Sequence, residues 1–586
     1  MQDTATDVLV VGAGPVGLTA SALLARYGID AITVAKHAGP SDTPRAHITN
    51  QRSMEVFREL GLEDEVTQFG TPIRLLGNNV WATSFAGLEL ARMPAWGAGW
   101  DRQGEYAATS PCEIFNAPQH LLDPVILSGA RKAGADVRFG MEVTWLEQGA
   151  EEVVASVLDR ESGDVGRIRA RYVVGADGAR STVARQTGFD YEGETGVLNY
   201  AVNVWLEADL TEYCAHRPSP LYWIYQPGDG CHSSTWITVR PWTEWVMAVV
   251  YPAHGGEPQL DTETALTYAR QMIGDPQVTI RVKAISPWSI AHAVATEYRR
   301  GRVLLAGDSA HRHPPPNGLG SNTGVQDAHN LCWKLAMVLR GQAGDGLLDT
   351  YHTERQPVGR QVVDRVMRSL HNMDPLTRAI GFDPQQTAEQ GWVKIGELCA
   401  DDARGRKRRA DLCEALELQQ YQYNCHGVES GMPYNAGAIV LDNGTPAESP
   451  EPPPKDAELN YAPSTIPGSF LPHAWLERDR VPVSTADIIG DGRFTLVAGV
   501  GGRDWIAAAE QVSRRFGVPI SAVMVGHHLE YHDVYGDWAR VRAVGEDGCV
   551  LVRPDRRVAW RAMHRCADPA TALSIVLQQV LHEESE

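Results

Sequence analysis

The stretch GDSAHRHPPPNGLGSNTG, residues Gly307–Gly324, decides the fold that we expect for this chain. The apolar run before it, Val303–Ala306, predicts a short buried strand. Three successive prolines, Pro314–Pro316, fix an extended segment that has no N–H donors. Apolar residues then recur every three or four positions from Val325, which predicts a helix that runs to about Arg340. The sequence therefore predicts a strand, a loop that fits a flat ligand, and a helix whose first N–H groups face that loop.

The start of the chain favours this interpretation over a turn-rich loop between two core elements. A buried strand over Asp7–Val11 leads directly into GAGPVG, and a helix and the strand Ala31–Ala35 follow. This is a βαβ unit opened by GxGxxG, the context that the motif requires. Its glycines allow a tight turn, the close approach of a pyrophosphate and close packing of helix on strand. We therefore expect a dinucleotide to be bound by Gly12, Gly14, Pro15, Val16 and Gly17.

The end of the second strand departs from this pattern. An acidic residue normally stands there and binds the ribose hydroxyls of the adenosine. Here Ala35 and Lys36 occupy that place. We expect Lys36 or the backbone to make the ribose contact instead.

Size and composition limit the class of protein. With 586 residues the chain is too long for one core, so we expect two or three domains. The net charge of −20 argues against nucleic acid or an anionic membrane surface as a partner. The nine cysteines include no CxxC pair, which favours reduced thiols in the cytoplasm over disulfides or a metal site. The N-terminus shows neither a signal peptide nor a membrane span.

The fold class that these patterns predict is mixed α/β. A Rossmann-like domain is expected over 1–187 and continues, with helices, over 288–400. Short alternating strands rich in tryptophan predict an antiparallel substrate-binding sheet over 188–287, and a connecting region covers 401–472 with a proline-rich linker over 445–472. Residues 473–586 show a thioredoxin-like order of elements. Gly499–Arg503 (GVGGR) stands where CxxC would open the helix, so we expect a packing or oligomerisation domain without disulfide exchange.

Three motifs in order carry a family resemblance: GAGPVG at Gly12, GADGARS at Gly175 and GDSAHRHPPPNGLGSN at Gly307. Together they resemble the single-component FAD-dependent aromatic hydroxylases of the para-hydroxybenzoate hydroxylase class. The segment PRAHITNQ at Pro44 is most similar to the phenol hydroxylase branch of that class. The resemblance implies bound FAD, NADPH or NADH as a transient reductant, O2 as co-substrate, a small aromatic substrate and a homo-oligomer.

The resemblance also implies roles for residues at matching positions. Asp177 matches a motif shared by cofactor and pyridine-nucleotide binding, although a turn or N-cap aspartate is the alternative. Arg45 is otherwise a surface arginine in a loop. The positions expected to contact FAD, in addition to the GxGxxG motif and Lys36, are Arg45, Gln119, Val143, Asp177, Asp308, Pro315, Gly320, Ser321 and Asn322.

The chemistry implied by the family is ring hydroxylation ortho to a hydroxyl, through a flavin C4a-hydroperoxide that needs dry surroundings. A free phenol has a pKa of about 10, so a base near the hydroxyl is useful. We expect His47 to be that base, working alone or through water, unless it is a structural histidine. Arg240, always charged, is expected to stabilise the phenolate oxygen. The expected substrate contacts are Trp96, Tyr222, Trp223 and Tyr225.

Three other functions are alternatives to ring hydroxylation. The sequence argues against a flavin-dependent halogenase, which needs a WxWxIP run that Pro287–Ile290 (PWSI) does not supply. A Baeyer–Villiger or epoxidising oxygenase of the same fold is a second alternative. A non-catalytic flavin-binding scaffold is the third, and turnover of NAD(P)H with a phenol separates it from a hydroxylase.

Overall fold

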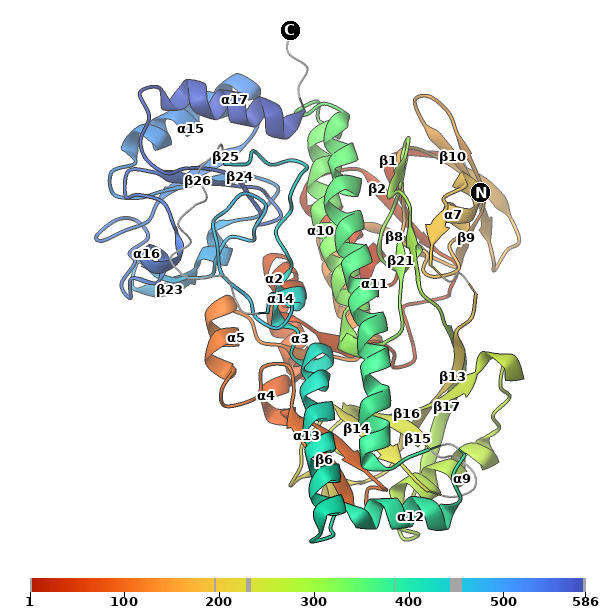
Figure 1. Cartoon of the computed structure of the whole chain (residues 1–586). Coiled ribbons are helices and arrows are strands. Elements are labelled where there is room, and N and C mark those ends of the chain that lie inside the picture. Colours follow the sequence, from red (N-terminus) through yellow and green to blue (C-terminus); the bar gives the residue numbers. More distant parts are fainter. Residues whose placement is uncertain (1–2, 194–195, 228–232, 384, 443–455, 583–586) are drawn as a thin grey trace.

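The computed structural model describes residues 3–193, 196–227, 233–383, 385–442 and 456–582 (Figure 1). The predicted βαβ unit is confirmed. Strand β1 (Thr4–Val11) leads through the glycine turn into helix α1 (Pro15–Arg26), and β2 (Ala31–Ala35) lies parallel to β1.

The first sheet brings the three sequence motifs to one edge. Its order is β19-β20-β11-β1-β2-β8, and β1, β11 and β20 are parallel neighbours. The carboxyl ends of parallel strands lie at the same edge, so the loops after these three strands meet there. Strand β10 pairs antiparallel with the first half of β11, and β9 pairs antiparallel with β10. The bounds are β8 (Asp136–Phe139), β9 (Met141–Gln148), β10 (Val153–Asp159), β11 (Val165–Gly175), β19 (Arg299–Arg300) and β20 (Val303–Leu305).

Two single elements in this region differ from their sequence patterns. The pattern over Asp136–Trp145 favours one strand, but the structure has two, because the chain turns at Gly140, whose φ is +74°. The helix predicted after Gly324 is α10 (Gly320–Leu339), which already begins inside the glycine-rich stretch.

A long helix spans the molecule. Helix α11 (Gly346–Ile380) packs on α10 at one end and reaches the second sheet at the other (Figure 1). The sequence predicts a helical stretch over Leu347–His371 with an interruption at Pro357, but the helix continues through Pro357 and Pro375. Its partner near the second sheet is α13 (Ala403–Tyr423), which lies inside the expected connecting region.

The second sheet has the order β17-β13-β16-β15-β14-β5-β6. Five of its strands are the expected antiparallel ones, but β5 and β6 come from residues 78–94, outside the range 188–287. The boundaries of the domains stay a prediction, with this addition. The bounds are β5 (Asn78–Ala82), β6 (Glu89–Pro94), β13 (Asn199–Glu207), β14 (Leu221–Tyr225), β15 (Ser233–Arg240), β16 (Glu244–Pro252) and β17 (Arg281–Ile290). Helix α9 (Thr262–Ile273) covers one face of this sheet.

The C-terminal part has the expected thioredoxin-like order. Its sheet is β25-β24-β26-β27, in which only β24 and β25 are parallel, and α15 and α17 pack together beside it. The bounds are β24 (Phe494–Ala498), α15 (Arg503–Phe516), β25 (Ile520–Met524), β26 (Cys549–Val552), β27 (Val558–Ala562) and α17 (Pro569–Leu581). Of the expected proline-rich linker, residues 445–455 lie outside the described residues. None of the described helices is both long and apolar enough to cross a bilayer.

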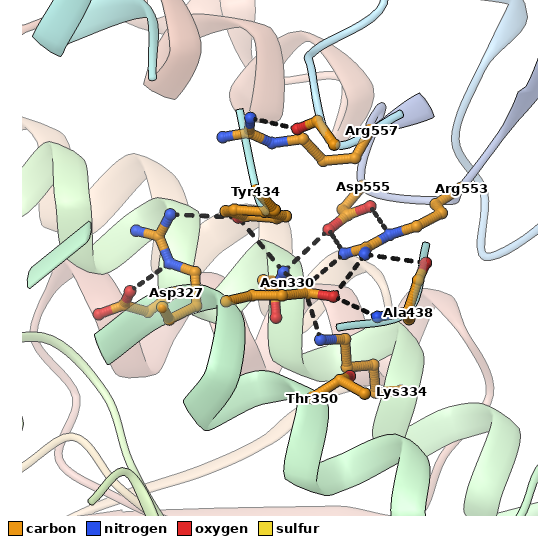
Figure 2. A network of polar contacts seen from close by, with 12 residues as sticks. Asp327, Asn330, Lys334, Thr350, Tyr434, Ala438, Arg553, Asp555 and Arg557 are labelled. Carbon is orange, nitrogen blue, oxygen red and sulfur yellow. Dashed lines mark hydrogen bonds and ion pairs between the residues drawn. The ribbon is translucent and has the colours of Figure 1, made fainter. Parts of the chain in front are cut away.

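A buried ion cluster joins the C-terminal part to α10 and α11 (Figure 2). The Glu354 carboxylate of α11 accepts hydrogen bonds from Lys334 Nζ at 2.8 Å and from both Nη atoms of Arg553 at 2.6 and 2.8 Å. Asn330 and the backbone N–H of Ala438 donate to the same carboxylate. Burial alone raises the pKa of Glu354, but the charges of Arg553 and Lys334 outweigh it and hold that pKa well below its usual value.

This cluster generates a prediction about stability. In Arg553→Met the buried carboxylates of Glu354 and Asp555 lose their main cation, which is expected to cost about 3–5 kcal/mol. Urea unfolding followed by fluorescence measures the change. The control is Arg74→Gln, which breaks the exposed ion pair with Glu113 and is expected to cost less than about 1 kcal/mol. Equal stabilities of the two variants would contradict the structural role of the cluster.

Candidate active site

The turn after β1 forms a cradle for a pyrophosphate. Gly12 has φ = +111°, and a Cβ there would collide with the carbonyl oxygen of Ala176. A Cβ at Gly17 would collide with the carbonyl oxygen of Gly12, whereas one at Gly14 would point into open space. Helix α1 starts with Pro15, and none of the described side chains caps its first N–H groups. Tight backbone contact on one side and uncapped N–H groups on the other fit the phosphates of FAD.

The proline-rich loop is anchored from behind by a buried carboxylate. Asp327 of α10 accepts hydrogen bonds from the Gly307 N–H at 3.0 Å and from His311 Nε2 at 2.7 Å. Arg355 of α11 donates to the same carboxylate at 2.7 Å and also bonds the Thr323 carbonyl. Both ends of the loop are thus hydrogen-bonded to the two helices that carry the ion cluster.

Asn322 fastens the same loop from the front. Its Oδ1 accepts from the Asn50 N–H at 3.0 Å and from Ser53 Oγ at 2.7 Å. Its Nδ2 donates to the carbonyls of Ile48 and Gly318. The side chain is only 2 % exposed, so Asn322 positions the loop rather than offering a free amide to a ligand.

The other expected FAD contacts lie around this cradle. Arg45, Lys36, Asp308 and Pro315 are exposed, and Gly320 and Ser321 are half-buried next to Asn322. The backbone N–H of Gln119 donates to the Ala46 carbonyl, which ties the first turn of α6 (Gln119–Lys132) to the segment that carries Arg45 and His47. Val143 is buried in the core, so its side chain offers almost no exposed surface to a ligand.

Asp177 takes up the alternative role that the sequence left open. Its Oδ1 accepts from Ser181 Oγ, and its Oδ2 accepts from the backbone N–H groups of Thr182 and Val183. The carboxylate therefore caps α7 (Thr182–Thr187). This arrangement supports a structural role and leaves no support for a side-chain contact with ribose.

His47 lies partly buried in a short polar chain. Its Nδ1 is 2.7 Å from Oδ1 of Asn116, and Nδ2 of Asn116 donates to the Thr238 carbonyl on β15 at 2.9 Å. A carbonyl only accepts, so the amide of Asn116 must turn its oxygen to His47, and Nδ1 must carry the proton. Burial lowers the pKa of His47 to about 4, against a smaller opposing effect of the Asn116 bond. At neutral pH the ring is thus neutral, and Nε2 is left as a proton acceptor.

Three of the four expected substrate residues share one apolar cluster with Ile48, the neighbour of His47. These three are Trp96, Trp223 and Tyr225. Tyr423 and Phe382 belong to the same cluster. The Trp96 ring packs edge-on against Tyr423 with 5.6 Å between centroids, and its buried indole N–H has no hydrogen-bond partner among the described residues. A buried polar atom without a partner is costly, so this N–H favours a bound acceptor.

The fourth residue, Tyr222, lies on the other face of the sheet. Alternate residues of a strand point to opposite faces, so Tyr222 cannot share a face with Trp223 or Tyr225 of β14. It is fully buried against Phe85 and Trp236 under α9, and its hydroxyl donates to the Arg217 carbonyl. The hypothesis that it contacts substrate finds no support here.

Arg240 is also separate from His47. It ends β15 with its side chain 63 % exposed, and its Nε donates to Glu244 at 2.9 Å. It lines an open cavity together with His120 and Trp205, not the aromatic cluster. The structure therefore does not bring the two expected catalytic side chains together.

The sequence analysis missed Asn116 and Asp327 as functional residues. Asn116 stands three residues before the first residue of α6, where an asparagine is usually taken for a cap or turn. Asp327 lies in the first half of α10 among other polar residues such as Gln326 and Asn330, so nothing local marks it. In both cases the partner lies far away in the sequence, so no local pattern marks the contact.

Comparison with known families agrees with this geometry. Residues 5–366 match the family described as FAD binding domain. Residues 464–583 match the family described as aromatic-ring hydroxylase, C-terminal.

Relatives match over nearly the whole chain. The 2,4-dichlorophenol 6-monooxygenase of Delftia acidovorans is 43 % identical over 98 % of each chain. The tetracenomycin B2 monooxygenase-dioxygenase of Streptomyces olivaceus is 32 % identical over 98 % of each chain. Among solved structures, the flavin-dependent monooxygenase PieE in complex with FAD and substrate is 44 % identical over 100 % of both chains, with a TM-score of 0.95.

The dinucleotide cradle, the anchored proline-rich loop and these matches agree with the resemblance drawn from the three motifs. The chain belongs to the family of FAD-dependent aromatic-ring hydroxylases, and it is a flavoprotein monooxygenase.

Proposed function

We propose that this enzyme hydroxylates a phenol-type ring ortho to its hydroxyl group, with His47 as the general base. The observation that carries the proposal is the neutral His47 ring, which Asn116 holds through Nδ1 so that Nε2 is left as a proton acceptor. Relatives named 2,4-dichlorophenol 6-monooxygenase and phenol 2-monooxygenase support the substrate class. In the overall reaction NAD(P)H supplies two electrons, one oxygen atom of O2 enters the ring and the other leaves as water.

FAD fits the cradle at Gly12–Gly17 and the loop at Pro315–Asn322, and when bound it supplies the redox chemistry that activates O2. The chain itself contributes a rigid wall. The loop that faces this position is held by the hydrogen bonds of Asn322 and of Asp327. Because it begins with three prolines, it offers few N–H groups that would bind water. This wall and the aromatic cluster exclude water from the reacting ring.

His47 acts on the substrate hydroxyl. A phenol has a pKa of about 10, so the imidazole does not remove its proton before reaction; it only accepts a hydrogen bond at Nε2. As the ortho carbon is attacked, positive charge grows on the ring and the hydroxyl becomes more acidic. The proton then passes to Nε2, while Asn116 keeps the ring oriented through Nδ1. Trp96, Trp223 and Tyr225 hold the plane of the substrate.

A homo-oligomer in the cytoplasm completes the proposal. Family resemblance supports the first part and the absence of a CxxC pair supports the second. Light scattering after gel filtration gives the oligomeric state directly, and a mass of one chain would overturn that part.

The test of the function uses the purified yellow protein. It is reduced anaerobically by NADPH or NADH with and without each of a panel of phenols, and O2 is then admitted. A phenol that speeds reduction and is recovered one oxygen heavier by mass spectrometry supports the proposal. Release of hydrogen peroxide alone with every phenol would overturn it.

Substitution of the base separates proton transfer from binding. His47→Gln still donates an N–H to Asn116 but has no group that accepts a proton. Because general bases contribute about 10²–10⁴-fold, the rate of product formation is expected to fall by at least about 100-fold. The rate of flavin reduction should change little, so peroxide replaces product. Full hydroxylation by this variant at neutral pH would dismiss His47 as the base.

The pH dependence follows from the lowered pKa of His47. The base works only when neutral, so kcat/KM is expected to fall as the pH drops through about 4, rather than near 6.5. In Asn116→Asp a carboxylate beside Nδ1 favours the charged ring and raises its pKa. The acid limb should therefore move to higher pH in this variant. An unchanged acid limb would show that another group controls it.

A further inference from the structure

A large open cavity lies at one end of the second sheet, outside the aromatic cluster. Its volume is about 820 Å³, which lies in the usual range of ligand sites. The ends of β13 and β15 and the starts of β16 and β17 form its floor, and the first turn of α6 forms the opposite wall. The residues that line it are His120, Leu121, Trp205, Glu207, Ala208, Asp209, Arg240, Thr243, Glu244, Thr279, Arg281 and Lys283.

The lining of the cavity carries three cations, Arg240, Arg281 and Lys283, beside three carboxylates. Arg281 donates to Glu207, and Lys283 Nζ donates to Glu244 at 2.6 Å. Arg240 uses only Nε, on Glu244, and within the described residues its two Nη groups make no hydrogen bond. The carboxylates thus hold the cations in place at the open side of the cavity, while the Nη groups of Arg240 stay available to an anion.

An aromatic surface lies between these cations. Lys283 Nζ is 3.8 Å from the centroid of the Trp205 ring, and the His120 ring meets the same tryptophan edge-on at 5.3 Å. Burial lowers the pKa of His120, so this ring is neutral at neutral pH. Cations beside a flat ring suit a ligand that carries both phosphates and an aromatic base.

Two connections place this cavity next to the proposed active site. His120 and Leu121 directly follow Gln119, whose N–H is tied to Ala46 beside His47. Arg240 lies two residues after Thr238, whose carbonyl holds Asn116 and through it His47. The wall of the cavity and the segment expected to touch FAD therefore share one helix turn and one strand end.

We propose that this cavity is the docking site of the nicotinamide dinucleotide, with Arg240, Arg281 and Lys283 facing its phosphates and Trp205 facing a ring. The inference rests on the proposed function, because that function needs a reductant that binds close to the flavin. The dihydronicotinamide gives up a hydride, two electrons with one proton, to the oxidised cofactor and leaves as the oxidised nucleotide.

The test compares variants of the holoenzyme that change one charge at the mouth. Arg281→Gln removes a cation from the cavity, and Glu207→Gln releases that cation from its carboxylate. Arg74→Gln is the matched control, since Arg74 is also exposed and also paired with one exposed glutamate, but it lies outside the cavity. The probes are ADP-ribose and its 2′-phosphate, which bind without reducing the flavin, and their dissociation constants are measured by titration calorimetry.

Arg281→Gln is expected to weaken binding of the preferred probe by about tenfold or more, as for a lost bond to a charged group. Glu207→Gln is expected to tighten it, and Arg74→Gln should leave it unchanged. In anaerobic stopped-flow, the nucleotide concentration for half-maximal reduction should shift in the same directions, while the limiting rate and the KM of the phenol stay constant.

The inference is overturned if Arg281→Gln binds the probe like the control, if Glu207→Gln does not tighten binding, or if the variants shift the KM of the phenol instead. Failure of the proposed function has a different signature. In that case the wild-type enzyme releases only hydrogen peroxide with every phenol, whatever the nucleotide affinities of the variants.

Discussion

The structure depends on one buried cluster of charges, in which Glu354 is held by Lys334 and Arg553 away from water. A buried carboxylate is tolerated only where cations and N–H donors surround it. The three parts of the chain that supply the carboxylate and its two cations must therefore stay together. Those parts are α10, α11 and the turn between β26 and β27. Arg355, the neighbour of Glu354, carries the same constraint to Asp327 and so to the start of the proline-rich loop. The cluster thus connects the C-terminal part with the loop that faces the flavin position.

This connection explains a C-terminal part that has the order of a thioredoxin but no CxxC. Its contribution lies in Arg553, Asp555 and Arg557, which enter the space between α10 and the chain around Tyr434 (Figure 2). Arg557 stacks on the rings of Tyr434 and Phe470 and donates to the Met432 and Gly468 carbonyls. The C-terminal part therefore holds α10 and α11 together. The expectation of a packing domain described this role only in general terms.

Local sequence patterns predicted what depends on neighbours along the chain. The βαβ unit, the strand before Gly307 and the alternation of the second sheet follow from periodicity and turn residues. The patterns failed where a distant partner decides. Asn116 hydrogen-bonds His47, and Asp327 hydrogen-bonds the Gly307 N–H. Strands β5 and β6 join a sheet whose other strands lie more than a hundred residues away in the sequence. Tyr222 is a different failure, because the period of two in β14 already places it opposite Trp223 and Tyr225. Arg240 ends β15, and the position of a residue at a strand end does not show the direction of its side chain.

The central claim of this account is that the phenol lies between the aromatic cluster and His47, next to the loop held by Asn322. The most direct measurement is a crystal structure of the enzyme with FAD and a phenol. The account predicts the phenol oxygen within hydrogen-bonding distance of His47 Nε2 and its ring among Trp96, Trp223 and Tyr225, with the flavin ring against the loop at Pro315–Asn322. A phenol bound in the cavity at Arg240, or one whose hydroxyl faces another base, would contradict it.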